Sequence, residues 1–129
     1  MPPKLILSAM VFAIAASPAF AAVETSVTLS LGGNAERKAV TYDCESHAPL
    51  VVTYVNAAPN FLAIMPVTND ETGQTDDVIF ASVIAASGAK YEAGQFIWWS
   101  KGSDATLHDV TEGLDAAPLL SCVERVETP

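Results

Sequence analysis

Short apolar runs that each end at a turn signal constrain this fold more than any other feature of the sequence. Residues 27–31 alternate apolar with hydroxyl side chains, residues 50–55 read LVVTYV, and residues 61–67 read FLAIMPV. Such short segments, rich in β-branched and aromatic side chains, are typical of β-strands, and no long segment has the 3.6-residue period of a helix. We therefore predict an all-β fold, a small antiparallel barrel or sandwich of about eight strands. The other predicted strands cover residues 40–44, 78–85, 95–99, 106–110 and 119–126.

Residues 1–21 have the three parts of a secretory signal peptide. Lys4 provides a basic start, residues 5–16 form an apolar stretch, and the tripeptide AFA at residues 19–21 matches the small-x-small cleavage pattern. The apolar stretch is shorter than the roughly 20 residues of a membrane span. No cysteine lies beside the cleavage site to carry a lipid. We therefore expect an exported protein, residues 22–129, with no stable membrane anchor.

With 129 residues, the chain has room for a single domain. We assign residues 22–39 to an N-terminal strand and linker segment, and residues 40–129 to the barrel domain. Several predicted strands are apolar on both faces, since Leu50 and Val52 lie on one face of their strand and Val51 on the other. One face fills the core, and a homodimer would cover the second.

The two cysteines of the sequence, Cys44 and Cys122, lie near the two ends of the predicted domain. In an exported chain this pair predicts a disulfide. Closing so long a loop stabilises a fold by about 4 kcal/mol in the chain-entropy model. The alternative is two buried free thiols. Neither cysteine lies beside a Lys, an Arg or a predicted helix start that would favour the thiolate, so a catalytic cysteine is not expected.

Acidic residues outnumber basic ones by 15 to 6, which gives a formal charge of −9. This balance argues against a nucleic-acid partner, whose binding rests on clusters of Lys and Arg, and favours a basic partner or a well-solvated surface. His47 and His108 are far apart in sequence, and one acidic cluster lacks the ligand spacing of a calcium loop. No metal or other cofactor is therefore expected. We predict a solvated hairpin tip for that cluster, which consists of Asp70, Glu71, Asp76 and Asp77.

A predicted hairpin holds the candidate binding residues. The segment from Tyr91 to Gln95 has the length of a tight turn, with Gly94 able to take a positive φ. If Tyr91 pairs with Gln95, Ser87 lies opposite Trp99 on the neighbouring strand. A bulge near Ser87 would shift this register.

In this register Ser87 and Lys101 are diagonal neighbours on one face, with Cβ atoms about 7–8 Å apart. A hydroxyl and an ammonium then project together beside Gly88 and Gly102, where the backbone can approach a partner closely. Two other interpretations stay open: Lys101 is a solvated turn residue, or the pair is a Ser-Lys hydrolase dyad. The chain is short and has no recognisable oxyanion-hole motif, so we do not expect an enzyme.

The same segment resembles the family of bacterial inhibitors of c-type lysozyme, which has membrane-bound and periplasmic members. Residues 87–91, SGAKY, match its Ser-Gly-x-x-Tyr motif, and residues 91–105, YEAGQFIWWSKGSDA, match its aromatic-Trp-x-Lys-Gly-x-x-Ala pattern. Cys44 and Cys122 match the family's paired cysteines, and the similarity covers residues 40–124. The missing lipid-bearing cysteine indicates the periplasmic type.

The resemblance implies a compact antiparallel barrel, stapled by one disulfide, that plugs the active-site cleft of an animal c-type lysozyme. In such inhibitors the motif Ser and the motif Lys reach the two catalytic carboxyl groups of the enzyme, and these residues correspond to Ser87 and Lys101. The motif Tyr, Tyr91, would support the loop by packing. The candidate lysozyme-binding residues are thus Ser87, Gly88, Lys90, Tyr91, Lys101 and Gly102.

The implied protein is a periplasmic inhibitor with no turnover and no cofactor, which protects a bacterium against a host enzyme. C-type lysozymes are basic, so the acidic charge of the chain would steer the two proteins together. The alternative hypothesis is a periplasmic β-barrel that binds a small apolar ligand, with Trp98 and Trp99 lining its cavity. Against it, one of these two tryptophans is expected in the core.

Overall fold

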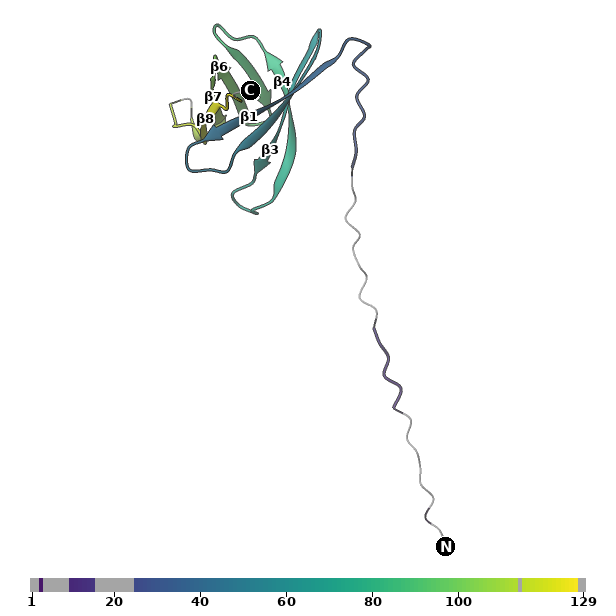
Figure 1. Cartoon of the computed structure of the whole chain (residues 1–129). Helices are drawn as coiled ribbons and strands as arrows, with labels where there is room; N and C mark the ends of the chain where they lie inside the picture. The colour runs from purple at the N-terminus through teal and green to yellow at the C-terminus, as the bar shows by residue number, and fades with distance from the viewer. Residues whose placement is uncertain (1–2, 4–9, 16–24, 114, 128–129) are drawn as a thin grey trace.

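The computed structural model describes residues 3, 10–15, 25–113 and 115–127. The strands between Glu36 and Glu124 form a closed antiparallel barrel (Figure 1). Its eight strands within the described ranges neighbour one another in chain order, and the last pairs with the first. The predicted all-β barrel with one disulfide is confirmed, and the sandwich alternative is wrong. The elements are β1 (Glu36–Cys44), β2 (Leu50–Ala57), β3 (Asn60–Thr68), β4 (Thr75–Val83), β5 (Ala89–Ala93), β6 (Phe96–Lys101), β7 (Asp104–Asp109), the 3-10 helix η1 (Val110–Glu112) and β8 (Leu120–Glu124).

Alternate side chains of the strands fill the barrel interior, as the two-residue period of a strand requires. In β2, Leu50 and Val52 are buried whereas Val51 is 48% exposed, which confirms the predicted division of this strand into two faces. Burial of a large apolar side chain stabilises a fold by about 1.5–3 kcal/mol. The largest side chains that are almost completely buried are those of Trp98, Phe80, Met65 and Val52.

The core contains a hydrogen-bonded aromatic cluster. The indole N–H of Trp98 donates to the Tyr54 hydroxyl at 2.9 Å, and the hydroxyls of Tyr54 and Tyr42 are 2.8 Å apart. The rings of Tyr42 and Trp98 meet edge to face with centroids 5.2 Å apart, a favourable geometry for buried aromatic pairs. Burial is the main cause that raises the pKa of Tyr42, so its hydroxyl stays protonated. The expectation that one tryptophan packs in the core is confirmed for Trp98.

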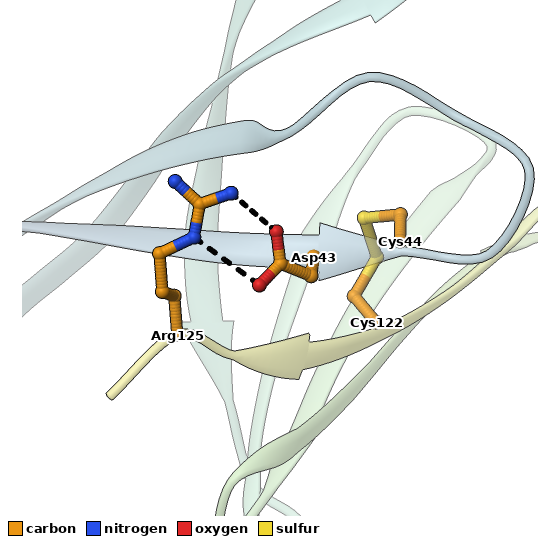
Figure 2. Close-up of polar contacts among 4 residues, drawn as sticks. All are labelled: Asp43, Cys44, Cys122 and Arg125. Atoms are coloured by element: carbon orange, nitrogen blue, oxygen red, sulfur yellow. Dashed lines mark hydrogen bonds and ion pairs between the residues drawn. A yellow bond between two sulfur atoms is a disulfide. The ribbon is translucent and has the colours of Figure 1, made fainter. Parts of the chain in front are cut away.

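Strands β1 and β8 close the barrel through three residue pairs, which we call the β1–β8 seam. Cys44 lies opposite Cys122 with a Cα–Cα distance of 4.0 Å, and their sulfurs form the disulfide (Figure 2). The free-thiol alternative is therefore wrong. Beside the disulfide, the Arg125 guanidinium donates two hydrogen bonds to the Asp43 carboxylate, at 2.5 and 3.2 Å (Figure 2). These hydrogen bonds lower the pKa of Asp43.

Residues 27–31 form no strand, contrary to the prediction. Strand β1 already pairs with β2 on one side and β8 on the other, so the closed barrel offers no free edge to a further strand. The barrel begins at Glu36, inside the segment 22–39 that was assigned to a strand and linker. The predicted signal peptide, residues 1–21, lies largely outside the described residues. In the part of the chain that is described, no helix is long and apolar enough to cross a membrane.

The outer face of β2, β3 and β4 carries apolar side chains, as the two-faced strand pattern predicts. Ile79 of β4 is 47% exposed on this face. The side chains of Val27, Leu29 and Leu31 border the same shallow cavity as Ile64 and Ile79. The N-terminal segment therefore lies next to this face without pairing to it, and the homodimer that would cover the face stays a prediction.

Candidate functional site

Two tight turns shape the ribbon formed by β5, β6 and β7. Gly94–Gln95 joins β5 to β6, and Gly102–Ser103 joins β6 to β7. The glycines have φ values of 56° and 61°, whereas Gln95 and Ser103 do not have positive φ. This is the pattern of type II′ turns, whose twist matches that of the flanking strands. Gly102 is therefore needed by the turn itself, and it leaves Lys101 at the exposed end of β6.

The observed register of β5 and β6 differs from the predicted one. Ala93 pairs with Phe96, so the turn has two residues where three were predicted. As a result Lys90 lies opposite Trp99, the position that the prediction gave to Ser87. Ser87 instead precedes β5, in the bend that connects it to β4. The predicted diagonal pairing within the ladder is therefore wrong.

The bend at Ser87 and Gly88 nevertheless lies directly against β6. Gly88 has a φ of 69°. A Cβ atom at this position would lie 2.3 Å from the carbonyl oxygen of Ser100 and 2.8 Å from Cγ of Lys101. Because real Cβ atoms do not approach so closely, only glycine fits here. The structure thus brings Ser87, Gly88 and Lys101 together by a close backbone approach.

Trp99 is the residue around which these contacts are arranged. Its indole N–H donates to the backbone carbonyl oxygen of Ser87 at 2.9 Å. The Lys101 ammonium lies 3.9 Å from the Trp99 ring centroid, and the Lys90 ammonium 5.5 Å from it. Both distances are within the range of a cation–π interaction. Sequence reasoning did not include Trp99 in the binding set, although strand alternation could have placed it: with Trp98 in the core, Trp99 must point outward.

The cations of the molecule differ in their partners. Lys90 forms an ion pair with Glu92 at 3.7 Å, and Arg125 forms one with Asp43. Lys101 forms no ion pair with any residue of the described ranges, and it is exposed. Its three N–H donors are therefore available to a carboxylate of another molecule.

Tyr91 lies in the core and not on the binding surface. Its side chain is 8% exposed, and its ring centroid is 5.7 Å from that of Tyr54. Its strand partner is Trp98, which also points inward. The register places Tyr91 on the inner face, away from a partner, and its expected support of the loop stays a prediction. Burial raises the pKa of its hydroxyl.

His108 lies on the outer face of β7 and adds no further positive charge to the two lysines around Trp99. Its Nε2 atom is 2.8 Å from Oγ1 of Thr106. Burial, and after it the positive charge of Lys90, lower the pKa of His108. Since an ordinary histidine is already largely neutral at pH 7, this imidazole is neutral there.

A cavity of about 400 Å³ lies at the opposite end of the barrel from Lys101. It is lined mainly by aliphatic side chains, and neither Trp98 nor Trp99 borders it. Trp98 is fully buried and Trp99 points outward, so neither takes the role that the small-ligand hypothesis gave it. That hypothesis stays a prediction. Aliphatic lining residues of the cavity are Leu50, Val67, Leu107, Leu119 and Leu120.

The fold and this surface define a class of small, disulfide-closed β-barrel proteins that present an exposed cation beside a tight glycine bend. Residues 42–115 match the model of a family described as membrane-bound lysozyme-inhibitor of c-type lysozyme. This match covers more than half of the chain, and the chain belongs to this family. The family resemblance of the sequence motifs is therefore confirmed.

Relatives support the same assignment. A Pseudomonas aeruginosa protein named membrane-bound lysozyme inhibitor of C-type lysozyme is 41% identical over 99 residues, which cover 75% of this chain and 74% of the relative. A Cupriavidus necator protein of the same name is 34% identical over 84 residues, 65% of this chain and 62% of the relative. Both names say membrane-bound, which conflicts with the expectation of a protein without an anchor.

A solved structure is also similar. It is the crystal structure of Pseudomonas aeruginosa MliC in complex with hen egg white lysozyme. It matches with a TM-score of 0.61 and 36% sequence identity, and the match covers 80% of this chain and 99% of that chain. The barrel fold is thus shared with a protein that was solved bound to a lysozyme.

Proposed function

We propose that this protein inhibits c-type lysozyme by occluding the active-site cleft, with Ser87 and Lys101 facing the two catalytic carboxyl groups. The observation that carries this proposal is Lys101: its exposed side chain has no ion-pair partner among the described residues, and the stem of this side chain at Cγ lies against Gly88 of the Ser87–Gly88 bend. Family membership and the likeness to MliC, solved in complex with hen egg white lysozyme, support the choice of partner.

The chemistry of the two side chains suits such a cleft. A retaining glycosidase holds two carboxyl groups about 5–5.5 Å apart, one protonated and one ionised. The Lys101 ammonium offers a compact positive charge to the ionised group. The Ser87 hydroxyl can both donate and accept, so it suits the group whose protonation changes. An inhibitor that holds both carboxyl groups excludes substrate and water together.

Charge supports rapid association, and nothing in the proposal requires turnover. The formal charge of −9 favours encounter with a basic enzyme at low ionic strength. Against this acidic background Lys101 provides a local positive charge for an acidic cleft. The protein acts as an inhibitor and not as an enzyme, and needs no cofactor for this role.

The proposed location is the periplasm, and the proposed form is one without a lipid. Both cysteines of the sequence are bonded to each other, so neither is available to carry a lipid. The names of the relatives favour a membrane-bound form instead. Detergent-free release of the protein with the periplasmic fraction is the expected result, and recovery only with the membrane fraction would overturn this part of the proposal.

A cell-wall lysis assay tests the function. Purified protein is added in molar excess to a c-type, a g-type and an i-type lysozyme, and the fall in turbidity of a wall suspension is followed. We expect inhibition of the c-type enzyme, and its loss in the Ser87→Ala/Lys101→Ala double variant. Lys38→Ala is the matched charge control, because Lys38 lies in β1, which does not neighbour β6.

Each negative result has its own meaning. A c-type lysozyme that keeps full activity in molar excess of the wild-type protein would overturn the proposed function. Inhibition that survives the double variant unchanged would leave the function standing and overturn the assignment of the site to Ser87 and Lys101.

A further inference from the structure

We propose that Trp99 is the positioning residue of the inhibitory site, because a single indole side chain holds both proposed binding groups in place. Its N–H donates to the Ser87 carbonyl oxygen at 2.9 Å, and its ring lies 3.9 Å from the Lys101 ammonium. This inference rests on the proposed function, since it concerns the same surface.

The position of Trp99 in β6 leaves its side chain available for this role. Its neighbour Trp98 is fully buried and supplies the aromatic packing and the hydrogen bond of the core. Trp99 points to the outer face and is only half-buried there. It lies between Lys90 on β5 and Thr106 on β7, its partners in the two ladders. An outward indole with no part in the core requires another explanation than barrel stability.

Contacts on two sides restrain the Lys101 side chain. The ammonium lies over the Trp99 ring, and the stem at Cγ lies against Gly88 of the bend. A free lysine side chain loses much rotamer entropy when it is fixed at an interface. Because these contacts already limit Lys101 before the partner arrives, the proposed binding step loses less entropy.

The neighbouring cation is held in a way that favours this arrangement. The Lys90 ammonium lies 5.5 Å from the same ring, and Glu92 forms an ion pair with it at 3.7 Å. The Glu92 carboxylate offsets the repulsion between the ammonium groups of Lys90 and Lys101. Lys101, which has no ion-pair partner within the described residues, therefore lies closer to the Trp99 ring than Lys90 does.

Two substitutions separate the contributions of the indole. Trp99→Phe keeps an aromatic face for Lys101 but removes the hydrogen bond to Ser87, and Trp99→Leu removes both. We expect the dissociation constant for hen egg-white lysozyme, measured by calorimetry, to rise about threefold to tenfold for Trp99→Phe and further for Trp99→Leu. Ile97→Ala is the matched control: Ile97 precedes Trp99 by two residues on the same face of β6, and its substitution is expected to leave affinity unchanged.

A double-mutant cycle distinguishes positioning from an independent contact. If Trp99 acts through Lys101, Trp99→Leu has a much smaller effect in a Lys101→Ala background than in the wild type. Additive effects, or wild-type affinity of Trp99→Leu, would overturn the inference. Thermal unfolding of each variant is measured alongside, and Trp99→Phe provides the answer if Trp99→Leu does not fold.

A measurement without any lysozyme separates this inference from the proposed function. In the free protein, the ring current of Trp99 shifts the NMR signals of the Lys101 methylene protons, and Trp99→Leu is expected to abolish this shift. The indole N–H is expected to exchange slowly with solvent. If the wild-type protein does not bind lysozyme, the function fails while these signals still report the arrangement; if it binds and the signals are absent, only the positioning role fails.

Discussion

The β1–β8 seam and the ribbon of β5, β6 and β7 use charge in opposite ways. At the seam the Arg125 guanidinium is paired with Asp43, beside the disulfide that joins Cys44 to Cys122. On the ribbon, Lys101 lies over an aromatic ring and has no carboxylate partner within the described residues. Paired groups hold the barrel closed, whereas an exposed group with no internal partner is available to another protein. The two regions should therefore respond differently to substitution.

Removal of the disulfide has the largest expected effect, and it tests whether the seam and the ribbon respond independently to substitution. We expect Cys44→Ala/Cys122→Ala to lower the free energy of unfolding by about 4 kcal/mol, because the bond closes a loop with a sequence separation of 78. Urea denaturation measures this loss. Lysozyme affinity of the folded variant, measured well below its unfolding temperature, should stay close to that of the wild type. A large fall in that affinity would show that the ribbon depends on the seam.

Lys101 and Arg125 form a matched pair of cations for the second prediction. We expect Lys101→Ala to weaken lysozyme binding by about 2–4 kcal/mol, the cost of losing a central charged contact. Its thermal unfolding should hardly change, because no ion pair within the described residues is lost. Arg125→Ala should show the reverse, with lower stability and unchanged affinity. Equal effects of the two substitutions on affinity would point to net charge instead of a specific contact.

Ser87→Ala tests the weaker of the two proposed contacts. A neutral hydroxyl contributes about 1 kcal/mol to a hydrogen-bonded contact, so affinity should fall less than for Lys101→Ala. Since the bend is held through the backbone oxygen of Ser87 and through Gly88, loss of the hydroxyl should leave its conformation intact. An effect as large as that of Lys101→Ala would contradict the proposed division of roles, and calorimetry with both variants decides it.

Most strands of the barrel could be predicted from the sequence. The predicted number, about eight, agrees with the structure only because one predicted strand is absent and one unpredicted strand is present. Residues 27–31 have the alternation of a strand, yet the closed barrel has no edge to receive them. The eighth strand of the barrel is instead β5, which was predicted only as one arm of the hairpin and was not among the eight predicted strands. Alternation shows that a segment can form a strand, whereas pairing depends on which edges remain available.

The motifs of the sequence supply the candidate site residues, but the arrangement of these residues could not be predicted from the motifs. Gly94 suits a turn of two or of three residues, and the sequence does not decide between them. The predicted and the observed turn give pairings of β5 with β6 that differ by an odd number of residues. Such a shift moves every side chain of one strand to the other face. Tyr91 was therefore expected on the binding surface and lies in the core. The Ser87–Gly88 bend still lies against β6, because Gly88 packs closely on Lys101 and the Trp99 indole donates to the Ser87 carbonyl oxygen.

The smallest expected effect is the pH dependence of the stability that the Asp43–Arg125 ion pair gives the seam. This dependence distinguishes the ion pair from the disulfide, which does not titrate. The hydrogen bonds from Arg125 lower the pKa of Asp43 below its ordinary value of 3.8. The stabilisation from this pair is thus complete above the ordinary value, and it is lost as the pH falls through the lowered pKa of the folded state. We expect Asp43→Asn to have a slightly lower unfolding temperature than the wild type at pH 7, and the difference to shrink as the pH falls towards 2. The effect is small because both side chains are about half exposed. A difference that stays constant from pH 7 to pH 2 would contradict the ion pair, since the disulfide does not titrate.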